Sequence, residues 1–346
     1  MTRLERLQES LEEPLLVTSL VNVRYLSGFA SSNAALLVEP DGATPRLFSD
    51  FRYAEAGRAV EGVEFVETRR SLVRELSEAL PGRIGVEADH LTWSDCRTLE
   101  SGGLELVPTT GLVEALRAIK DDAELGLIRR ACAIADRVFE RLAAEPFVGR
   151  AERDVAWTIQ QLFHEEGADG LAFESIVGSG TNGARPHARA GDRVIGRGEA
   201  VVIDAGCTVG GYASDYTRTF FTGPPEGRLR EAYDVCRQAH EAALAAIRAG
   251  VTGIDADAVA RGVIEESEFA GTFGHGLGHG LGLEVHEAPR LGKESTDTLA
   301  AGNVVTVEPG IYLPGEGGIR IENDVLVTDD GIDDLTNVTK EPVEVG

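Results

Sequence analysis

The feature that most constrains this chain is a fourteen-residue segment, Phe273 to His286, in which glycine recurs at every second position from 274 to 282. It holds three of the chain's seven histidines, at 275, 279 and 286. The first two have the i, i+4 spacing of a helical zinc motif, but each glycine would destabilise a helix by about 1 kcal/mol. We therefore expect extended backbone that is bare on one face, where a ligand can approach, with histidines on the other. The competing interpretation of this segment alone is a glycine-rich loop with hydrogen-bonded histidines.

The composition indicates a globular protein that does not bind nucleic acid. The 346 residues are 42% hydrophobic, which is sufficient for a well-buried core. The formal charge of −25 is dispersed along the chain and argues against binding to nucleic acid or to an acidic membrane. The sequence starts without an apolar signal segment and has no run of eighteen apolar residues. We therefore expect a cytoplasmic protein.

The pattern of hydrophobic residues divides the chain into two domains, 1–118 and 119–346. In the first, short apolar strands (from Leu15, 34–39, 46–49 and 83–87) alternate with helical patterns (2–13, 51–60, 69–80 and 92–100), which is typical of a small α/β domain. In the second, helices predicted at 121–143, 151–166, 226–249 and 255–267 are separate from strand-rich stretches at 172–222 and towards the C-terminus. This segregation favours an α+β domain with a curved antiparallel sheet.

Two aspartates lie on strands that are predicted to pair. Asp204 ends one apolar strand, Asp215 opens the next, and Val209-Gly-Gly-Tyr212 is the expected hairpin turn. Opposed residues of a hairpin share a face, so both carboxylates, with Thr217 after them, are expected on the same face. Such neighbours repel unless a cation or a shared proton neutralises them.

Two glutamates repeat this arrangement. Glu308 follows the apolar run 304–307, and Glu322 ends the run 318–321, so we expect a second hairpin with a turn rich in glycine and proline. Alternation places Arg320 and Glu322 on one face. Four carboxylates and one imidazole suit Mn, Fe, Co or Zn, and their charge favours two ions about 3.5–4 Å apart. The alternative is a set of independent ion pairs with surface arginines.

Five motifs follow one another in the second domain. They are Ile203-Asp204-Ala-Gly, Ser214-Asp215-Tyr-Thr-Arg-Thr, Gly276-Leu-Gly-His279-Gly-Leu-Gly-Leu-Glu-Val-His286, Thr306-Val-Glu308-Pro-Gly-Ile-Tyr and Ile319-Arg320-Ile-Glu322. With these motifs in this order, the chain resembles over nearly its whole length the pita-bread-fold metallopeptidases of the Xaa-Pro aminopeptidase and prolidase family. The segments 22–29 and 49–53 resemble the family's N-terminal domain. The resemblance implies a pita-bread domain, with a curved antiparallel sheet and flanking helices, after a smaller N-terminal α/β domain.

The resemblance also implies which residues bind metal. It makes Asp204, Asp215, His279, Glu308 and Glu322 the ligands of a dinuclear site, with Asp215 and Glu322 bridging the two ions. The resemblance also makes Glu308 the general base that acts on a bridging water. The metal ions are expected to lower the pKa of that water and to polarise the scissile carbonyl. Manganese is the expected metal, with cobalt, zinc and iron as alternatives.

Further positions match family residues that contact the substrate. The resemblance assigns catalytic and substrate-binding roles to His187 and His286, and substrate-binding roles to His275 and Arg290. Arg320 and Thr217 are expected to orient a metal-bridging carboxylate. Arg290 fits a substrate carboxylate but does not decide between a dipeptidase and an aminopeptidase that accepts longer peptides.

The expected function is hydrolysis of the Xaa-Pro bond in short proline-containing peptides by a homodimer. A creatinase-like, metal-independent hydrolase and a non-catalytic pita-bread binding module are the alternatives, but chains of both kinds lack the carboxylates that are all present here. Methionine aminopeptidase shares the five ligands, yet the extra N-terminal domain and the segment that ends in Arg290 favour the proline branch.

Overall fold

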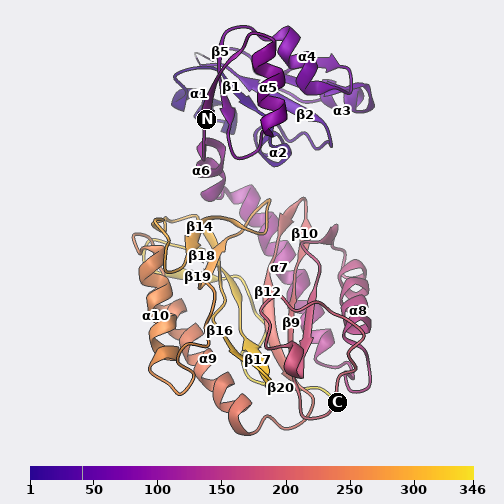
Figure 1. Ribbon diagram of the computed structural model, residues 1–346, viewed down its shortest axis with the longest axis vertical. Coiled ribbons are helices and arrows are strands. Elements are labelled where there is room, and N and C mark those ends of the chain that lie inside the picture. Colours follow the sequence, from indigo (N-terminus) through magenta and orange to yellow (C-terminus); the bar gives the residue numbers. More distant parts are fainter. Residues whose placement is uncertain (41) are drawn as a thin grey trace. The chain divides into compact units, whose positions relative to one another are not determined.

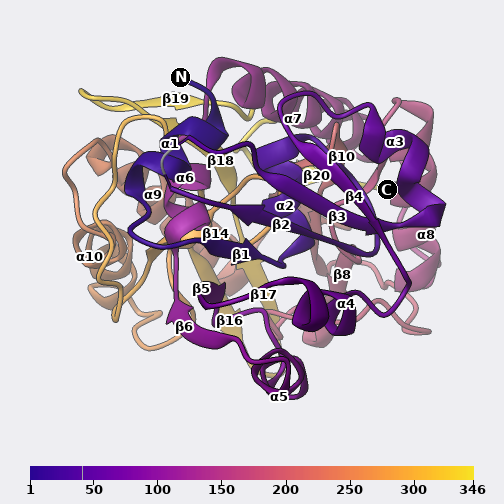
Figure 2. The ribbon, with the colours of Figure 1, turned by 90° about the horizontal axis from the view of Figure 1, so that it is seen from above.

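The computed structural model describes residues 1–40 and 42–346 and divides into two compact units, Met1–Arg117 and Ala118–Gly346. Unit 1 contains a six-stranded mixed sheet in the order β4-β3-β2-β1-β5-β6 (Figures 1 and 2). The strands are β1 (Leu15–Val17), β2 (Ala34–Val38), β3 (Arg46–Asp50), β4 (Glu64–Thr68), β5 (Arg83–Glu87) and β6 (Glu105–Thr109). The helices are α1 (Arg3–Ser10), α2 (Leu20–Ser27), α3 (Ala54–Arg58), α4 (Leu72–Ala79), α5 (Trp93–Ser101) and α6 (Leu112–Ala118), whose last residue already belongs to the second unit, with a 3₁₀ turn η1 (Phe51–Tyr53) before α3.

The local sequence accounts for several of these boundaries. Helix α1 begins at a capping box in which Thr2 and Glu5 exchange hydrogen bonds, and α2 ends at Gly28, whose φ of 72° suits glycine. Leucines of α4 and α5 pack with the apolar side chains of β1, β2, β3 and β5 to form the core of the unit. The helix predicted at 51–60 is divided, because Asp50 caps the 3₁₀ turn and α3 starts only after it.

Two strands of unit 1 were not predicted from the sequence. Strands β4 and β6 are the edges of the sheet, and all of their residues are exposed or half-buried. An edge strand has fewer apolar residues than a central strand, so its hydrophobic pattern is weak. Helix α2 was also missed, since four of its eight residues are buried and its pattern is not that of a surface helix.

Unit 2 consists of four helices and four small sheets among the described residues. The helices are α7 (Asp122–Leu142), α8 (Glu152–Glu165), α9 (Gly227–Ala246) and α10 (Gly253–Glu265), all close to the predicted ranges. The strands up to α9 are β7 (Gly170–Leu171), β8 (Ile176–Ser179), β9 (Ala200–Ala205), β10 (Cys207–Val209), β11 (Tyr212–Ala213) and β12 (Tyr216–Phe221), with a 3₁₀ turn η2 (Gly180–Asn182). Those after α10 are β13 (Gly278–Gly280), β14 (Glu287–Leu291), β15 (Val304–Val307), β16 (Gly310–Leu313), β17 (Gly317–Arg320), β18 (Asn323–Val327), β19 (Ile332–Asp334) and β20 (Val343–Glu344).

The helices of unit 2 flank its strands in two pairs. Helices α7 and α8 lie beside β7, β8, β10 and β11, whereas α9 and α10 lie beside β14, β16 and β17 (Figure 1). Each pair packs against the strands through its own hydrophobic cluster, α7 and α8 around Phe139, Phe163 and Tyr216, and α9 and α10 around Tyr233, Phe269 and Ile311. The strands between the helix pairs therefore have a helix-covered side, while their ends and bends are free to carry polar groups.

The aspartate hairpin is present, but it spans two sheets. Strands β9 and β12 pair with Asp204 opposite Thr217, and the turn lies at Gly210 as predicted. The residues between them form a separate hairpin of β10 and β11 that joins β7. The change of sheet occurs at Gly206, where a Cβ atom would lie 1.8 Å from the carbonyl oxygen of Ser214.

The predicted glutamate hairpin is present, but its ladder is interrupted at the two glutamates, between the pairs Val307–Asn323 and Gly310–Arg320. Strand β15 pairs with β18, and β16 pairs with β17 in a ribbon of its own. Glu308 therefore lies in the break between β15 and β16, and Glu322 in the break between β17 and β18. Pro309 explains the first break, because proline has no N–H to continue the ladder. Both glutamates sit where the backbone bends, not inside regular strands.

Candidate metal centre and active site

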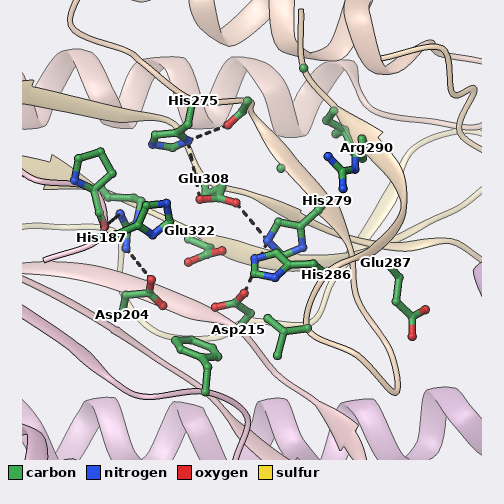
Figure 3. Close-up of a pocket in the computed structure, with 18 of the residues that line it drawn as sticks. His187, Asp204, Asp215, His275, His279, His286, Glu287, Arg290, Glu308 and Glu322 are labelled. Carbon is green, nitrogen blue, oxygen red and sulfur yellow. Dashed lines mark hydrogen bonds and ion pairs between the residues drawn. The ribbon is translucent and has the colours of Figure 1, made fainter. Parts of the chain in front are cut away.

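A cavity of about 880 Å³ in unit 2 brings the predicted site residues together (Figure 3). It is lined by all five expected metal ligands, by three further histidines and by two arginines. These are Asp204, Asp215, His279, Glu308, Glu322, His187, His275, His286, Arg290 and Arg320. Thr217 lies beneath the cavity wall and is fully buried. The glycine-rich segment is not helical in any part and is a strand only over β13.

The five candidate ligands come from four different parts of unit 2. Asp204 is on β9, Asp215 lies directly before β12, His279 is on β13, and the two glutamates are in the strand breaks. The Nε2 atom of His279 is 3.3 Å from Oε1 of Glu308 and 3.7 Å from Oδ2 of Asp215. Ligand atoms of Asp215, His279 and Glu322 all lie within 4.8 Å of one another, a spacing that one cation can bridge.

Hydrogen bonding leaves the correct nitrogen of His279 facing the carboxylates. Its Nδ1 atom lies 3.1 Å from the carbonyl oxygen of Gly280 and donates to it, so Nε2 is the atom that can bind a metal. Burial lowers the pKa of His279, but the hydrogen bond to Glu308 and the surrounding carboxylates raise it to about 9. In the absence of a metal ion, the neighbouring carboxylates thus favour the protonated, positively charged form of this ring.

The electrostatics of the carboxylates test whether they fit a metal. Burial raises the pKa of Asp215 and of Glu322 well above the usual range, and repulsion from neighbouring carboxylates raises both further. Burial also raises the pKa of Asp204. The Oδ1 atom of Asp204 is buried without a hydrogen-bond partner among the described residues. An unpartnered oxygen among repelling carboxylates fits divalent cations, because oxygen donors and one imidazole are suitable ligands.

Arg320 connects the carboxylates to the rest of the unit. Its Nη2 donates to Asp204 Oδ2 at 2.5 Å and its Nε to Thr217 Oγ1 at 2.9 Å. Thr217 in turn donates to Oε2 of Glu322 at 2.6 Å. The arginine therefore contacts one candidate ligand directly and orients another through the threonine hydroxyl.

Tyr312, on β16, extends this network and was not predicted as a site residue. Its hydroxyl accepts a hydrogen bond from Arg320 Nη1 at 2.9 Å and lies 2.8 Å from Nε2 of His275. The other ring nitrogen of His275 donates to the carbonyl oxygen of Gly276 at 2.8 Å, so Nε2 accepts the proton of the tyrosine. Both nitrogens of His275 thus have protein partners. The tyrosine was missed because a tyrosine in an apolar strand is usually a core residue.

A second network fixes the start of the glycine-rich segment. Arg261, on α10, forms a bidentate ion pair with Asp257 at 2.7 Å for both bonds and donates to the carbonyl oxygens of Phe273 and His275. Asp257 also accepts the N–H of Leu277 at 3.0 Å. In the sequence, Asp257 and Arg261 have the i, i+4 spacing of an ordinary ion pair on a helix surface. Their role in holding the glycine-rich segment could therefore not be predicted from the sequence.

Three predicted substrate-contacting side chains are exposed on the cavity wall. His187 and Arg290 are exposed, and the exposed ring of His286 lies edge-on to that of His279 at 4.3 Å between centroids. Burial lowers the pKa of His286, and the positive charge of His279 lowers it further. Arg320 Nη1 donates to the carbonyl oxygen of Pro186 at 3.1 Å and so holds the loop that carries His187.

A second group of potential ligands lies in unit 1, but its geometry does not favour a metal. Potential ligand atoms of Glu87, His90 and Glu114 lie within 4.8 Å of one another. Oε2 of Glu87 accepts the N–H groups of residues 18 and 19, and its Oε1 accepts from Asn22. Asn22 also donates to Glu114. These bonds already use the carboxylate oxygens of Glu87 to join β5 to the start of α2.

Comparison with known proteins identifies the class to which this fold and site belong. Residues 126–329 match the model of metallopeptidase family M24, and residues 3–119 match the creatinase/prolidase N-terminal domain. The chain is a member of metallopeptidase family M24, and the pita-bread fold and the family predicted from the motifs are confirmed.

Particular relatives refine this placement. The Xaa-Pro dipeptidase of Pyrococcus furiosus is 35% identical over 351 residues, which cover 98% of this chain and 99% of that protein. A solved Xaa-Pro dipeptidase from Bacillus anthracis has 36% identity and a TM-score of 0.95, with 99% of each chain covered. An X-Pro aminopeptidase from Thermotoga maritima has 34% identity and a TM-score of 0.89, covering 99% of this chain and all of that one. The relatives are prolidase-like, which disfavours the creatinase alternative.

Among the described residues, no helix is both long and apolar enough to span a membrane.

Proposed function

We propose that this protein hydrolyses the Xaa-Pro bond at the N-terminus of short peptides or in dipeptides. The observation that carries the proposal is one cavity in which five candidate metal ligands lie beside two exposed histidines and an exposed arginine. Relatives that cover nearly all of this chain are named as Xaa-Pro dipeptidases or as an X-Pro aminopeptidase. Both their names and the donor set support the same reaction class.

We propose that each subunit binds two divalent metal ions. Manganese is the expected metal, and cobalt, zinc and iron are the alternatives. Asp204, Asp215, His279, Glu308 and Glu322 would hold them. When bound, the ions supply Lewis-acid chemistry, polarising the scissile carbonyl and lowering the pKa of water. The buried arginine and threonine described above keep two of these carboxylates oriented before any substrate arrives.

Glu308 is proposed to accept the proton of the attacking water. Burial alone would raise the pKa of Glu308, but without metal the hydrogen bond and charge of His279 lower it to about 2. Bound divalent ions would supply the positive charge in place of a protonated His279 and keep the carboxylate ionised at neutral pH. Thr306 Oγ1 lies 3.3 Å from Oε1 of Glu308 and restricts its rotation. An ionised, oriented carboxylate on the cavity wall is suited to take a proton and pass it to the leaving nitrogen.

The exposed residues are proposed to contact the peptide. His187 and His286 can donate to the peptide oxygen and to the developing oxyanion, and Arg290 can pair with a C-terminal carboxylate. Phe173, Ile176 and other apolar side chains line part of the same cavity and offer a surface for the proline ring. The imide nitrogen carries no hydrogen, so the site needs no acceptor for it.

We further propose that the protein acts as a homodimer in the cytoplasm. All four cysteines are free thiols, three of them buried, which is consistent with a reducing compartment. The homodimer rests on the family resemblance alone and is tested by light scattering on the purified protein.

The function is tested by stripping the protein with a chelator, reloading it with Mn²⁺ and assaying four substrates. Leu-Pro and Leu-Pro-Pro should be hydrolysed, whereas Met-Ala and creatine should not, and the ratio of the first two separates dipeptidase from aminopeptidase activity. Asp215→Asn should abolish the activity, while the exposed control Asp329→Asn should not change it. Full activity of the stripped protein, or of Asp215→Asn, would overturn the proposal.

A further inference from the structure

Glu287, the residue after His286, has its carboxylate turned away from the metal-binding carboxylates (Figure 3). Oε2 forms an ion pair with Nζ of Lys120 at 3.0 Å, and the two side chains are only 5% and 1% exposed. A carboxylate so buried and already paired is not suited to bind a substrate amine. Because a buried charge is costly unless it is paired, the pair must have a structural or positioning role.

The loop that carries His286 is built around this carboxylate. Oε1 of Glu287 accepts the N–H of Glu284 at 3.0 Å, and Gly282 donates to the carbonyl oxygen of Glu284 at 3.0 Å. A Cβ atom at Gly282 would lie 2.7 Å from both carboxylate oxygens, so glycine leaves the room that the carboxylate occupies. The conformation of residues 282–287 therefore depends on where Glu287 is held.

Lys120 is itself anchored to the strand that leads to the metal site. Its N–H donates to the carbonyl oxygen of Gly302 at 2.9 Å, and Asn303 Nδ2 donates to the carbonyl oxygen of Ala118 at 2.8 Å. These residues form the turn directly before β15, and β15 ends directly before Glu308. The ammonium group is thus fixed relative to the proposed general base.

We propose that Lys120 is a positioning residue for substrate binding. Its ion pair with Glu287 sets the distance between the loop of His286 and the strand of Glu308. The inference rests on the proposed function, since it concerns how the peptide is held during that reaction. Only three of the chain's 33 basic side chains are lysines, and a compact ammonium fits this enclosed position.

The test compares Lys120→Met, Glu287→Gln and the double variant, each loaded with Mn²⁺, in steady-state hydrolysis of Leu-Pro. Both single variants should keep the metal content of the wild type and lower kcat/KM by about tenfold or more, mainly through KM, because the loop and not the metal site is displaced. The double variant should lose no more than the worse single variant, since both changes break one interaction.

The matched control is Lys340→Met. Lys340 also pairs with a carboxylate, Asp334, at 3.0 Å in the same unit, but the two side chains are partly exposed and outside the cavity. This variant should keep the KM of the wild type. If Lys120→Met does not fold, the isosteric Glu287→Gln decides the test.

Hydrogen exchange at the amide of Glu284 gives a second measurement, one that needs no substrate. The exchange should be faster in Lys120→Met and Glu287→Gln and unchanged in Lys340→Met. Wild-type protein that hydrolyses neither Leu-Pro nor Leu-Pro-Pro would refute the proposed function, and the exchange data would still test the loop. Unchanged KM together with unchanged exchange in both single variants would overturn the positioning role.

Discussion

Replacing Tyr312 by phenylalanine removes one oxygen atom from the centre of the polar network without changing the shape of the side chain. The tyrosine is only 7% exposed, so water cannot readily replace its hydroxyl. The substitution takes an acceptor from Arg320 and a donor from Nε2 of His275. Arg320 keeps its bonds to Asp204 and Thr217, but the segment from β16 to His275 loses its polar connection to them.

The magnitude follows from the two lost bonds. A hydrogen bond to a charged group contributes about 1.5–3 kcal/mol, and leaving a buried polar atom unsatisfied costs about 1–3 kcal/mol. Arg320 Nη1 retains the carbonyl oxygen of Pro186 at 3.1 Å, so only part of the first value is lost. We expect Tyr312→Phe to lower the free energy of unfolding by about 2 kcal/mol. We expect kcat to fall about tenfold, which corresponds to about 1.4 kcal/mol of lost transition-state stabilisation.

The assay measures urea unfolding and Leu-Pro hydrolysis for the manganese-loaded variant, with Tyr233→Phe as its control. Tyr233 is a buried tyrosine of the same unit whose hydroxyl donates to the carbonyl oxygen of Lys340 at 3.1 Å, away from the cavity. The control should lose about 1 kcal/mol of stability and keep its kcat. If Tyr312→Phe also keeps the wild-type kcat, the hydroxyl does not connect the site as argued.

Three further predictions concern the metal, a glycine and acid stability. Mn²⁺ at 100 times its Kd should raise the free energy of unfolding by about 2.7 kcal/mol, and Asp215→Asn should abolish the difference between melts with and without chelator. Gly278→Ala should lower the free energy of unfolding by about 1–3 kcal/mol, because its Cβ would lie 2.0 Å from the carbonyl oxygen of Thr306. Urea titration measures this loss. In the control Gly274→Ala, where the added Cβ has open space around it, the free energy of unfolding should change little. The hydrogen bond from Arg52 holds the pKa of Asp50 below its usual range, so this carboxylate stabilises the folded state above about pH 4 and ceases to do so as pH falls; acid titration of Asp50→Asn should show a shallower loss of stability.

The candidate ligands could be found from the sequence because each lies in a short motif with a local pattern. Asp204 lies on β9 and Asp215 directly before β12, and the pairing of these two strands depends on a glycine turn ten residues or fewer away. The alternating glycines ruled out a helix by propensity alone. Features that depend on residues nearby in the sequence can be predicted from it, and the candidate ligands found in this way do line one cavity.

The remaining features depend on contacts between residues that are distant in the sequence. Glu308 and Glu322 lie on the two arms of the predicted hairpin, but the sequence did not predict that its ladder is interrupted at both of them and divides into β15-β18 and β16-β17. Lys120 and Glu287 are 167 residues apart, so no periodicity connects them. Tyr312 is indistinguishable from a core tyrosine until Arg320 is placed beside it.

The exposure of the side chains separates two kinds of residue in this site. Arg320 and Thr217 are buried and use their hydrogen-bonding groups within the protein, so they can fix the carboxylates but cannot adapt to different peptides. His187 and Arg290 are exposed on the cavity wall and have room to meet substrates of different length. A buried network tolerates little change, because each lost partner leaves an unsatisfied polar group. The peptide lengths that this site accepts should therefore depend on the exposed side chains, while the buried framework keeps the candidate ligands in place.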